Sequence, residues 1–216
     1  MTSVTLYRAS GLALLLGSLI VLIGFVLRAL DPGINLTQEA SALFVTSNVL
    51  VFSGLALLLF GWLGIVARLA ELSGWLGLAG ALLIFLSGVV FASIIGYNFL
   101  ASPWYAVHAP NAAAQVAFGT PEAVVAAYVA SSLFFGGAVL AELAMIRARL
   151  LAAWAGVLMV VAGVLALVFL FVLFSFTASF ILFAVAVPLF VLGLGWMAYE
   201  LLSAKGEAPR HPAPTP

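Results

Sequence analysis

Charged, amide and aromatic side chains that could bind a polar ligand are concentrated around two connections between apolar segments. The first connection follows residue 28, and the second spans residues 101–119. Guanidinium, carboxylate, amide and imidazole groups together offer donors and acceptors, and a connection as long as the second is often functional. We predict a ligand pocket here, with simple interfacial anchoring as the alternative. The candidate ligand-binding residues are Arg28, Asp31, Glu39, Asn48, Asn98, Trp104, Tyr105 and His108.

A second group of candidate residues is a set of serines inside the apolar segments. A helical rise of about 1.5 Å per residue places them near the middle of the first four segments. A buried serine hydroxyl can donate to a carbonyl of its own helix or of a neighbouring helix, or it can line a polar path. Both interpretations stay open on the sequence. The serines are Ser18, Ser53, Ser87, Ser131 and Ser132.

Several chemistries are excluded by the residue types present. The chain has no cysteine, and its histidines, His108 and His211, both lie outside the apolar segments. A haem or a zinc ion therefore has no ligands within the helices. No glycine-rich nucleotide motif and no basic stripe for nucleic acid occur. Glu142 and Glu200 lie near arginines, which favours ion pairs at a membrane surface. We expect no catalytic residues, no metal and no cofactor.

The elements that must position these residues are transmembrane helices. Hydrophobic residues make up 66% of the 216 residues and charged residues 6%, and a helix crosses a bilayer with about 20 apolar residues. We predict an all-α bundle of six transmembrane helices over residues 1–202. Residues 203–216, rich in proline, are expected to form a disordered cytoplasmic tail. The expected spans are residues 8–30, 41–66, 74–100, 121–146, 150–173 and 179–202.

The distribution of arginine and lysine predicts the orientation of these spans. If the spans alternate in direction, only Arg28 falls on one side of the membrane, and cytoplasmic connections are the ones enriched in positive charge. Both termini are therefore expected in the cytoplasm. Tryptophan and tyrosine residues at the span ends agree with this arrangement. The residues on the expected cytoplasmic side are Arg8, Arg68, Arg147, Arg149, Lys205 and Arg210.

Small residues predict how the helices pack. Gly88, Ala92 and Gly96 follow one another at four-residue spacing on the third span, and such ladders allow helices to approach closely in lipid. Because only spans 1–4 carry central serines, we expect them to form the inner bundle. Spans 5 and 6, with a kink at Pro188, are expected to face lipid or a partner protein.

The entry Tyr7-Arg8-Ala9-Ser10-Gly11, the six spans and the longer third connection resemble small bacterial membrane proteins of unknown function. The resemblance extends over the general layout of the whole chain and implies no activity. It implies a location in the bacterial inner (plasma) membrane, in contact with membrane lipids.

The function expected from the sequence is non-catalytic. The chain is predicted to be an accessory subunit of a membrane complex or a binder of an apolar ligand such as a lipid, quinone or pigment. One alternative is a small transporter or channel for a neutral or weakly polar solute, with the serines and Asn48 along its path. A second alternative is an intramembrane enzyme that uses His108 or Glu39.

Overall fold

The computed structural model describes residues 3–30, 41–72, 74–111, 121–147, 153–172 and 176–203. Six long helices and one short helix account for almost all of these residues, and the described part of the chain contains no strand. The long helices are α1 (Ser3–Leu30), α3 (Ala42–Leu72), α4 (Gly74–Leu100), α7 (Pro121–Arg147), α8 (Ala153–Val172) and α9 (Phe176–Ser203). The short helix is α5 (Ser102–His108).

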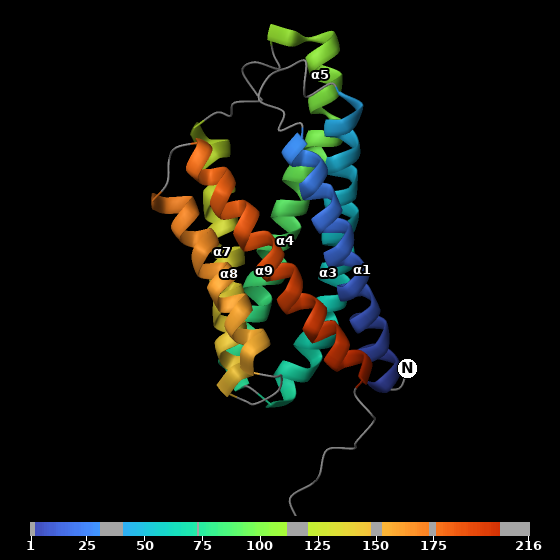
Figure 1. The fold of residues 1–216 in the computed structure, drawn as a ribbon, viewed down its shortest axis with the longest axis vertical. Coiled ribbons are helices and arrows are strands. Elements are labelled where there is room, and N and C mark those ends of the chain that lie inside the picture. Colours follow the sequence, from blue (N-terminus) through green and yellow to red (C-terminus); the bar gives the residue numbers. More distant parts are fainter. Residues whose placement is uncertain are drawn as a thin grey trace, which may run out of the picture.

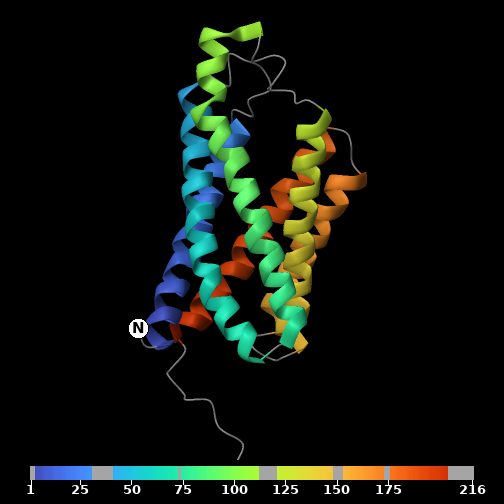
Figure 2. The same ribbon diagram turned by 180° about the vertical axis from the view of Figure 1, so that it is seen from behind.

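The six long helices form a closed ring in which neighbours in sequence are neighbours in space (Figure 1). α1 packs against α3 and α9, which closes the ring, and α4, α7 and α8 continue it in order. Successive helices run in opposite directions, and both views show α1 beginning and α9 ending at the same end (Figures 1 and 2). We call this the terminal end, and we call the opposite end, where α5 lies, the α5 end.

The outer surface of the ring is apolar. Large aliphatic side chains such as Leu16 on α1, Leu82 on α4 and Val161 on α8 are exposed there. Five helical stretches in the described residues are long and apolar enough to cross a membrane, and α8 adds a shorter apolar stretch from Trp154 to Val168. Because an apolar outer surface of this kind requires lipid as its solvent, the structure is that of an integral membrane protein.

The tightest contact is between α1 and α3, and glycine makes it possible. A Cβ atom added to Gly17 would lie 2.8 Å from the carbonyl oxygen of Gly54, and one added to Gly54 would lie 2.9 Å from the carbonyl oxygen of Gly17. Gly24 and Gly61 repeat this close approach one heptad along each helix. In lipid, such backbone contact between small residues supplies much of the attraction between helices.

The predicted ladder on the third span makes a different kind of contact. A Cβ at Gly88 would meet the side chain of Leu59, and one at Gly96 would meet only the ring of Phe52, at 3.6 Å. The backbone contact of α4 is instead at Gly80, where an added Cβ would lie 2.7 Å from the backbone nitrogen of Ala141 on α7. The ladder thus accommodates neighbouring side chains rather than a neighbouring backbone.

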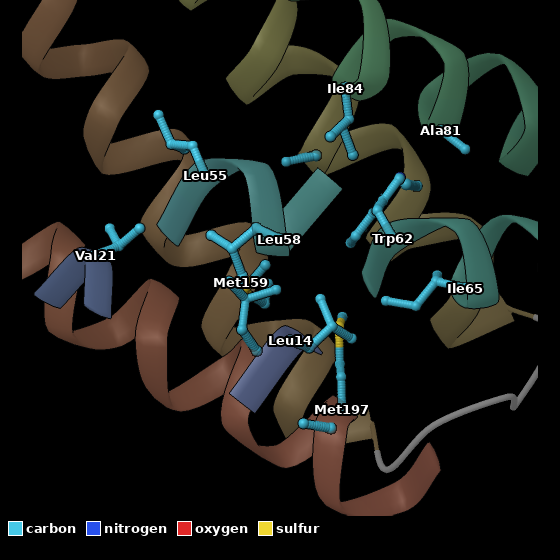
Figure 3. Packing of buried hydrophobic residues seen from close by; sticks show 14 of the residues in the cluster. Leu14, Val21, Leu55, Leu58, Trp62, Ile65, Ala81, Ile84, Met159 and Met197 are labelled. Carbon is cyan, nitrogen blue, oxygen red and sulfur yellow. The ribbon is translucent and has the colours of Figure 1, made fainter. Parts of the chain in front are cut away.

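The expectation that spans 1–4 alone form the inner bundle is wrong, while a partner protein packed on spans 5 and 6 stays a prediction. α8 and α9 complete the ring, and Met159 and Met197 are fully buried in the same core cluster as Leu14 of α1 (Figure 3). Missing serines do not indicate a peripheral position, because alanine, methionine and leucine fill the inward faces of α8 and α9. Pro188 lies within α9 and is exposed.

The helix boundaries differ most from the expected spans at three places: α1 begins at Ser3 rather than at residue 8, α3 ends at Leu72 rather than at residue 66, and the third connection contains a helix. Residues 102–108, expected in a loop, form α5. The first turn of this helix contains a proline, at a position that proline favours. α9 begins at Phe176, so Thr177 and Ser179 belong to the helix rather than to a turn. Ser203, the first residue of the predicted tail at 203–216, is the last residue of α9, and residues 204–216 lie outside the described residues.

Candidate functional site

A small cavity lies at the centre of the ring. Its volume is about 30 Å³, which is room for one or two water-sized molecules. Figure 3 shows core side chains from α1, α3, α4, α8 and α9 packed in the interior of the bundle. The described residues around the cavity come from all six long helices and are apolar except for the indole of Trp62. They are Leu14, Leu55, Leu58, Leu59, Trp62, Ile84, Gly88, Phe134, Ala138, Met159, Phe190 and Leu194.

The predicted serine layer does not surround this cavity. Ser18 is buried and donates to the carbonyl oxygen of Leu15 at 2.9 Å, while Ser87 is buried and its hydroxyl lies within hydrogen-bonding distance of the Leu83 and Ile84 carbonyl oxygens. Each bond stays within one helix, as serine commonly does in helices. Ser53 is exposed on the outer surface of α3. Ser131 is buried and Ser132 is half-buried on α7.

Two of the predicted ligand-binding residues meet at the α5 end. Arg28 of α1 donates from Nη1 to Oδ1 of Asn48 on α3 at 2.6 Å, and its guanidinium lies 4.5 Å from the centre of the Phe44 ring. The Asn48 side chain is buried and donates from Nδ2 to the Phe44 carbonyl oxygen at 2.8 Å. A buried primary amide requires such partners. The cluster joins α1 to α3 through charge-assisted and cation–π contacts.

The aromatic residues of the second connection lie on α5. The rings of Trp104 and His108 are stacked with centroids 5.0 Å apart, and Trp104 meets Tyr105 edge to face at 5.2 Å. His108 Nδ1 lies 3.0 Å from the Trp104 carbonyl oxygen. α5 packs chiefly against α4. Asp31 and Glu39 lie outside the described residues, as does the side chain of Asn98, so the described part of the chain contains only a portion of the predicted pocket.

Glu142 of α7 does not lie at the surface, where it was expected to form an ion pair. The side chain is fully buried, and neither carboxylate oxygen accepts a hydrogen bond from a described residue. Arg147, five positions later, is exposed. Gly156 of α8 faces the carboxyl, and a Cβ added to it would lie 3.6 Å from Oε2 of Glu142. Glu142 therefore lies within the bundle at the α7–α8 contact, and the expectation of an ion pair with Arg147 is not supported by the geometry.

Two other buried polar atoms share this half of the bundle. The hydroxyl of Ser10 and the indole nitrogen of Trp62 also have no hydrogen-bond partner among the described residues. By helical rise, Ser10, Trp62 and Glu142 lie about 10, 15 and 8 Å from the terminal ends of their helices. Buried polar groups are normally paired. The half of the bundle nearer the terminal end therefore contains three residues, on three helices, whose buried polar atoms have no partner among the described residues.

Beyond these residues, aromatic side chains gather at the terminal end. The rings of Trp154 on α8 and Trp196 on α9 have centroids 4.4 Å apart, and Tyr199 lies beside Trp196. Trp196 donates from Nε1 to Oε1 of Glu200 at 2.8 Å. Glu200 thus has a hydrogen-bond donor, in contrast to Glu142. Aromatic residues at this level are typical of a headgroup belt.

No protein-family model matches the chain, and neither a curated protein nor a solved structure is found that matches it. Within the described residues, no three histidine, cysteine or acidic side chains are grouped as metal ligands. The candidate sites are therefore defined by geometry alone. They are the central cavity and the buried carboxyl of Glu142.

Sequence reasoning missed both features, although part of the signal is visible in the chain. Glu142 is flanked by Ala141, Leu143 and Ala144, and it lies four residues after Ala138 and three before Met145, which both face the core. An acidic residue in register with core positions predicts burial. The nearness of Arg147 in sequence suggests an ion pair instead of burial. That suggestion is misleading, because residues five apart lie on different faces of a helix.

Proposed function

We propose that the chain crosses the membrane six times, α8 included, with both termini on the cytoplasmic side. The ring supports an even number of spans, because α1 begins at the end where α9 finishes (Figure 1). Arg8 and Arg147 are exposed at this end, and Arg28 lies at the other. Positive charge favours the cytoplasmic side, which makes the terminal end the cytoplasmic one.

Single-cysteine variants test this orientation cleanly, because the chain has no cysteine of its own. Val107→Cys lies on α5, where the side chain is 65% exposed, and Ser203→Cys lies at the exposed end of α9. A membrane-impermeant maleimide is expected to label Val107→Cys in intact cells, and Ser203→Cys only after permeabilisation. Labelling of both variants in intact cells, or the reverse order, would contradict the proposal.

The function that the geometry supports best is the binding of a small apolar molecule at the centre of the bundle. The observation that carries this proposal is the central cavity, to which all six long helices contribute apolar side chains. Unfilled apolar space loses dispersion contacts and costs stability, and an apolar cavity stays free of water while accepting apolar guests. The cavity volume limits the guest to a small molecule or to the end of an apolar chain.

Trp62 narrows the class of guest. It is the only described residue of the lining with a polar side-chain N–H group, and that group has no partner among the described residues. A buried donor without an acceptor costs about 1–3 kcal/mol. A guest that presents an oxygen acceptor, such as a carbonyl or ether oxygen on an apolar body, would offset this cost when the indole reorients toward it. Lipid and quinone chemistry both fall within this description.

Filling the cavity tests the proposal. Ala138 is 1% exposed and lines the cavity, so Ala138→Leu should occupy the space. We expect organic extracts of the purified wild-type protein to contain a bound apolar molecule, and extracts of Ala138→Leu to lack it. Ala56→Leu makes the same change on the exposed face of α3 and should retain the molecule. Equal extracts from all three proteins would contradict binding in the cavity.

Transport along the serines gains no support from their positions. The hydroxyls of Ser18 and Ser87 are directed to carbonyls of their own helices, and Ser53 lies on the outer surface. A role as an accessory subunit and the intramembrane enzyme remain predictions from the sequence. The apolar central cavity instead favours binding.

A further inference from the structure

The carboxyl of Glu142 has surroundings that no structural role explains. The side chain is fully buried among apolar residues at the α7–α8 contact, and neither oxygen has a hydrogen-bond partner in the described part of the chain. A buried ionisable group without a partner is costly, and inside a membrane bundle such a group usually marks a functional position. A carboxylate there would attract a positively charged species, which could be a metal ion, an organic cation or a proton.

The helices packed against α7 supply no compensating charge. α8 contains no ionisable residue, and the only one on α4 is Tyr97, near the α5 end. On α7 itself, Glu122 and Tyr128 lie toward the α5 end, and Arg147 is exposed at the terminal end. Across the ring, Glu200 of α9 accepts a hydrogen bond from Trp196. None of these groups is shown to neutralise a Glu142 carboxylate.

The geometry also distinguishes among possible cations. A metal ion requires several oxygen ligands, and no group of three acidic or histidine side chains occurs in the described residues. An organic cation requires space beside the carboxyl, but Glu142 is fully buried and lies against Gly156, where an added Cβ would lie 3.6 Å from Oε2. A proton requires neither additional ligands nor space. It converts the carboxylate into a neutral carboxyl, which is compatible with apolar surroundings.

We propose that Glu142 is a proton-binding site inside the membrane, reached from the terminal end. The carboxyl lies about 8 Å from the end of α7 by helical rise, and it faces α8 at Gly156, which has no side chain to separate the two helices. When Glu142 takes up a proton, α7 and α8 pack closely. When it releases the proton, the carboxylate must gain water, which requires these helices to separate at the terminal end. Proton binding is thereby linked to the fit between α7 and α8.

An apolar carbodiimide tests whether the buried carboxyl carries a proton. Dicyclohexylcarbodiimide partitions into lipid and reacts with a protonated acid: the carboxyl oxygen bonds to the central carbon, and the proton passes to a nitrogen. An acyl shift then gives a stable N-acylurea, and no group leaves. With the full chain in liposomes at neutral pH, we expect one adduct, located by mass spectrometry on the peptide that contains Glu142. Glu142→Gln should lose the adduct, and Glu200→Gln should retain it.

The outcomes separate proton binding from ordinary solvent exposure. A water-soluble carbodiimide is expected to leave Glu142 unlabelled at neutral pH, and equal labelling by both reagents would show an exposed acid and contradict the proposal. As a second measurement, the infrared spectrum should contain a protonated-carboxyl band that Glu142→Gln lacks. Absence of the adduct together with absence of the band would overturn the proposal. These results do not depend on whether an apolar molecule occupies the central cavity. Organic extracts of Glu142→Gln and Glu200→Gln would measure that occupancy separately.

Discussion

Replacing Gly54 by leucine is expected to disrupt the bundle by forcing apart its two most closely packed helices. A Cβ at this position would lie 2.8 Å from the backbone nitrogen of Val21 and 2.9 Å from the carbonyl oxygen of Gly17. Backbone atoms cannot move aside as a flexible side chain can, so α1 and α3 must separate. We expect the free energy of unfolding to fall by about 3 kcal/mol or more, measured by unfolding in mixed detergent micelles.

The matched control is Gly136→Leu on α7. A Cβ added to Gly136 has no atom within 4 Å, and replacing a helical glycine usually favours the helix by up to about 1 kcal/mol. This variant should unfold at the wild-type detergent concentration or above it. If Gly54→Leu were as stable as Gly136→Leu, the close contact of α1 and α3 would not contribute to the stability of the bundle.

The small residues behind this prediction are visible in the sequence, but their partners are not. Gly17 and Gly24 are seven residues apart on α1, and Gly54 and Gly61 are seven apart on α3. The four-residue ladder that begins at Gly88 satisfies the same packing rule equally well. Spacing alone cannot distinguish a glycine that faces a backbone from one that faces a side chain, because the difference depends on the partner helix.

Helix positions are the most predictable part of the fold. Long apolar segments separated by proline, glycine or charge give helices whose ends mostly agree with the expected spans within a few residues, because the thickness of the hydrocarbon layer sets their length. The order around the ring is not predictable in this way. Every long helix is rich in apolar residues on both its inward and its outward side, so no periodicity in hydrophobicity separates the two.

The candidate sites illustrate the same limit. Arg28 and Asn48 were predicted to belong together at one end, and the structure places Nη1 and Oδ1 of these side chains 2.6 Å apart. The central cavity could not be predicted, because it arises from the combined shape of side chains on six helices. The burial of Glu142 depends on its rotational position relative to α8, which the sequence indicates only through its spacing from Ala138 and Met145.

Replacing Glu142 by methionine is expected to stabilise the protein. Methionine has a similar length, is apolar and adapts to irregular space, so it can occupy the position without leaving an unsatisfied acceptor. A buried acceptor without a partner costs about 1–3 kcal/mol, and we expect the free energy of unfolding to rise by about 2 kcal/mol in the same micelle assay. Most substitutions in a core lower stability. A rise at this position would therefore show that the presence of Glu142 is not explained by a contribution to stability.

Glu200→Met provides the comparison, because it removes an acid that has a donor. The Oε1 atom of Glu200 accepts a hydrogen bond from Trp196 at 2.8 Å, and its loss should lower the free energy of unfolding by about 1 kcal/mol. Opposite signs for the two variants would separate a functional acid from a structural one, since proteins retain destabilising residues mainly at functional positions. A fall in stability for Glu142→Met would instead show that the carboxyl contributes to the packing of α7 and α8.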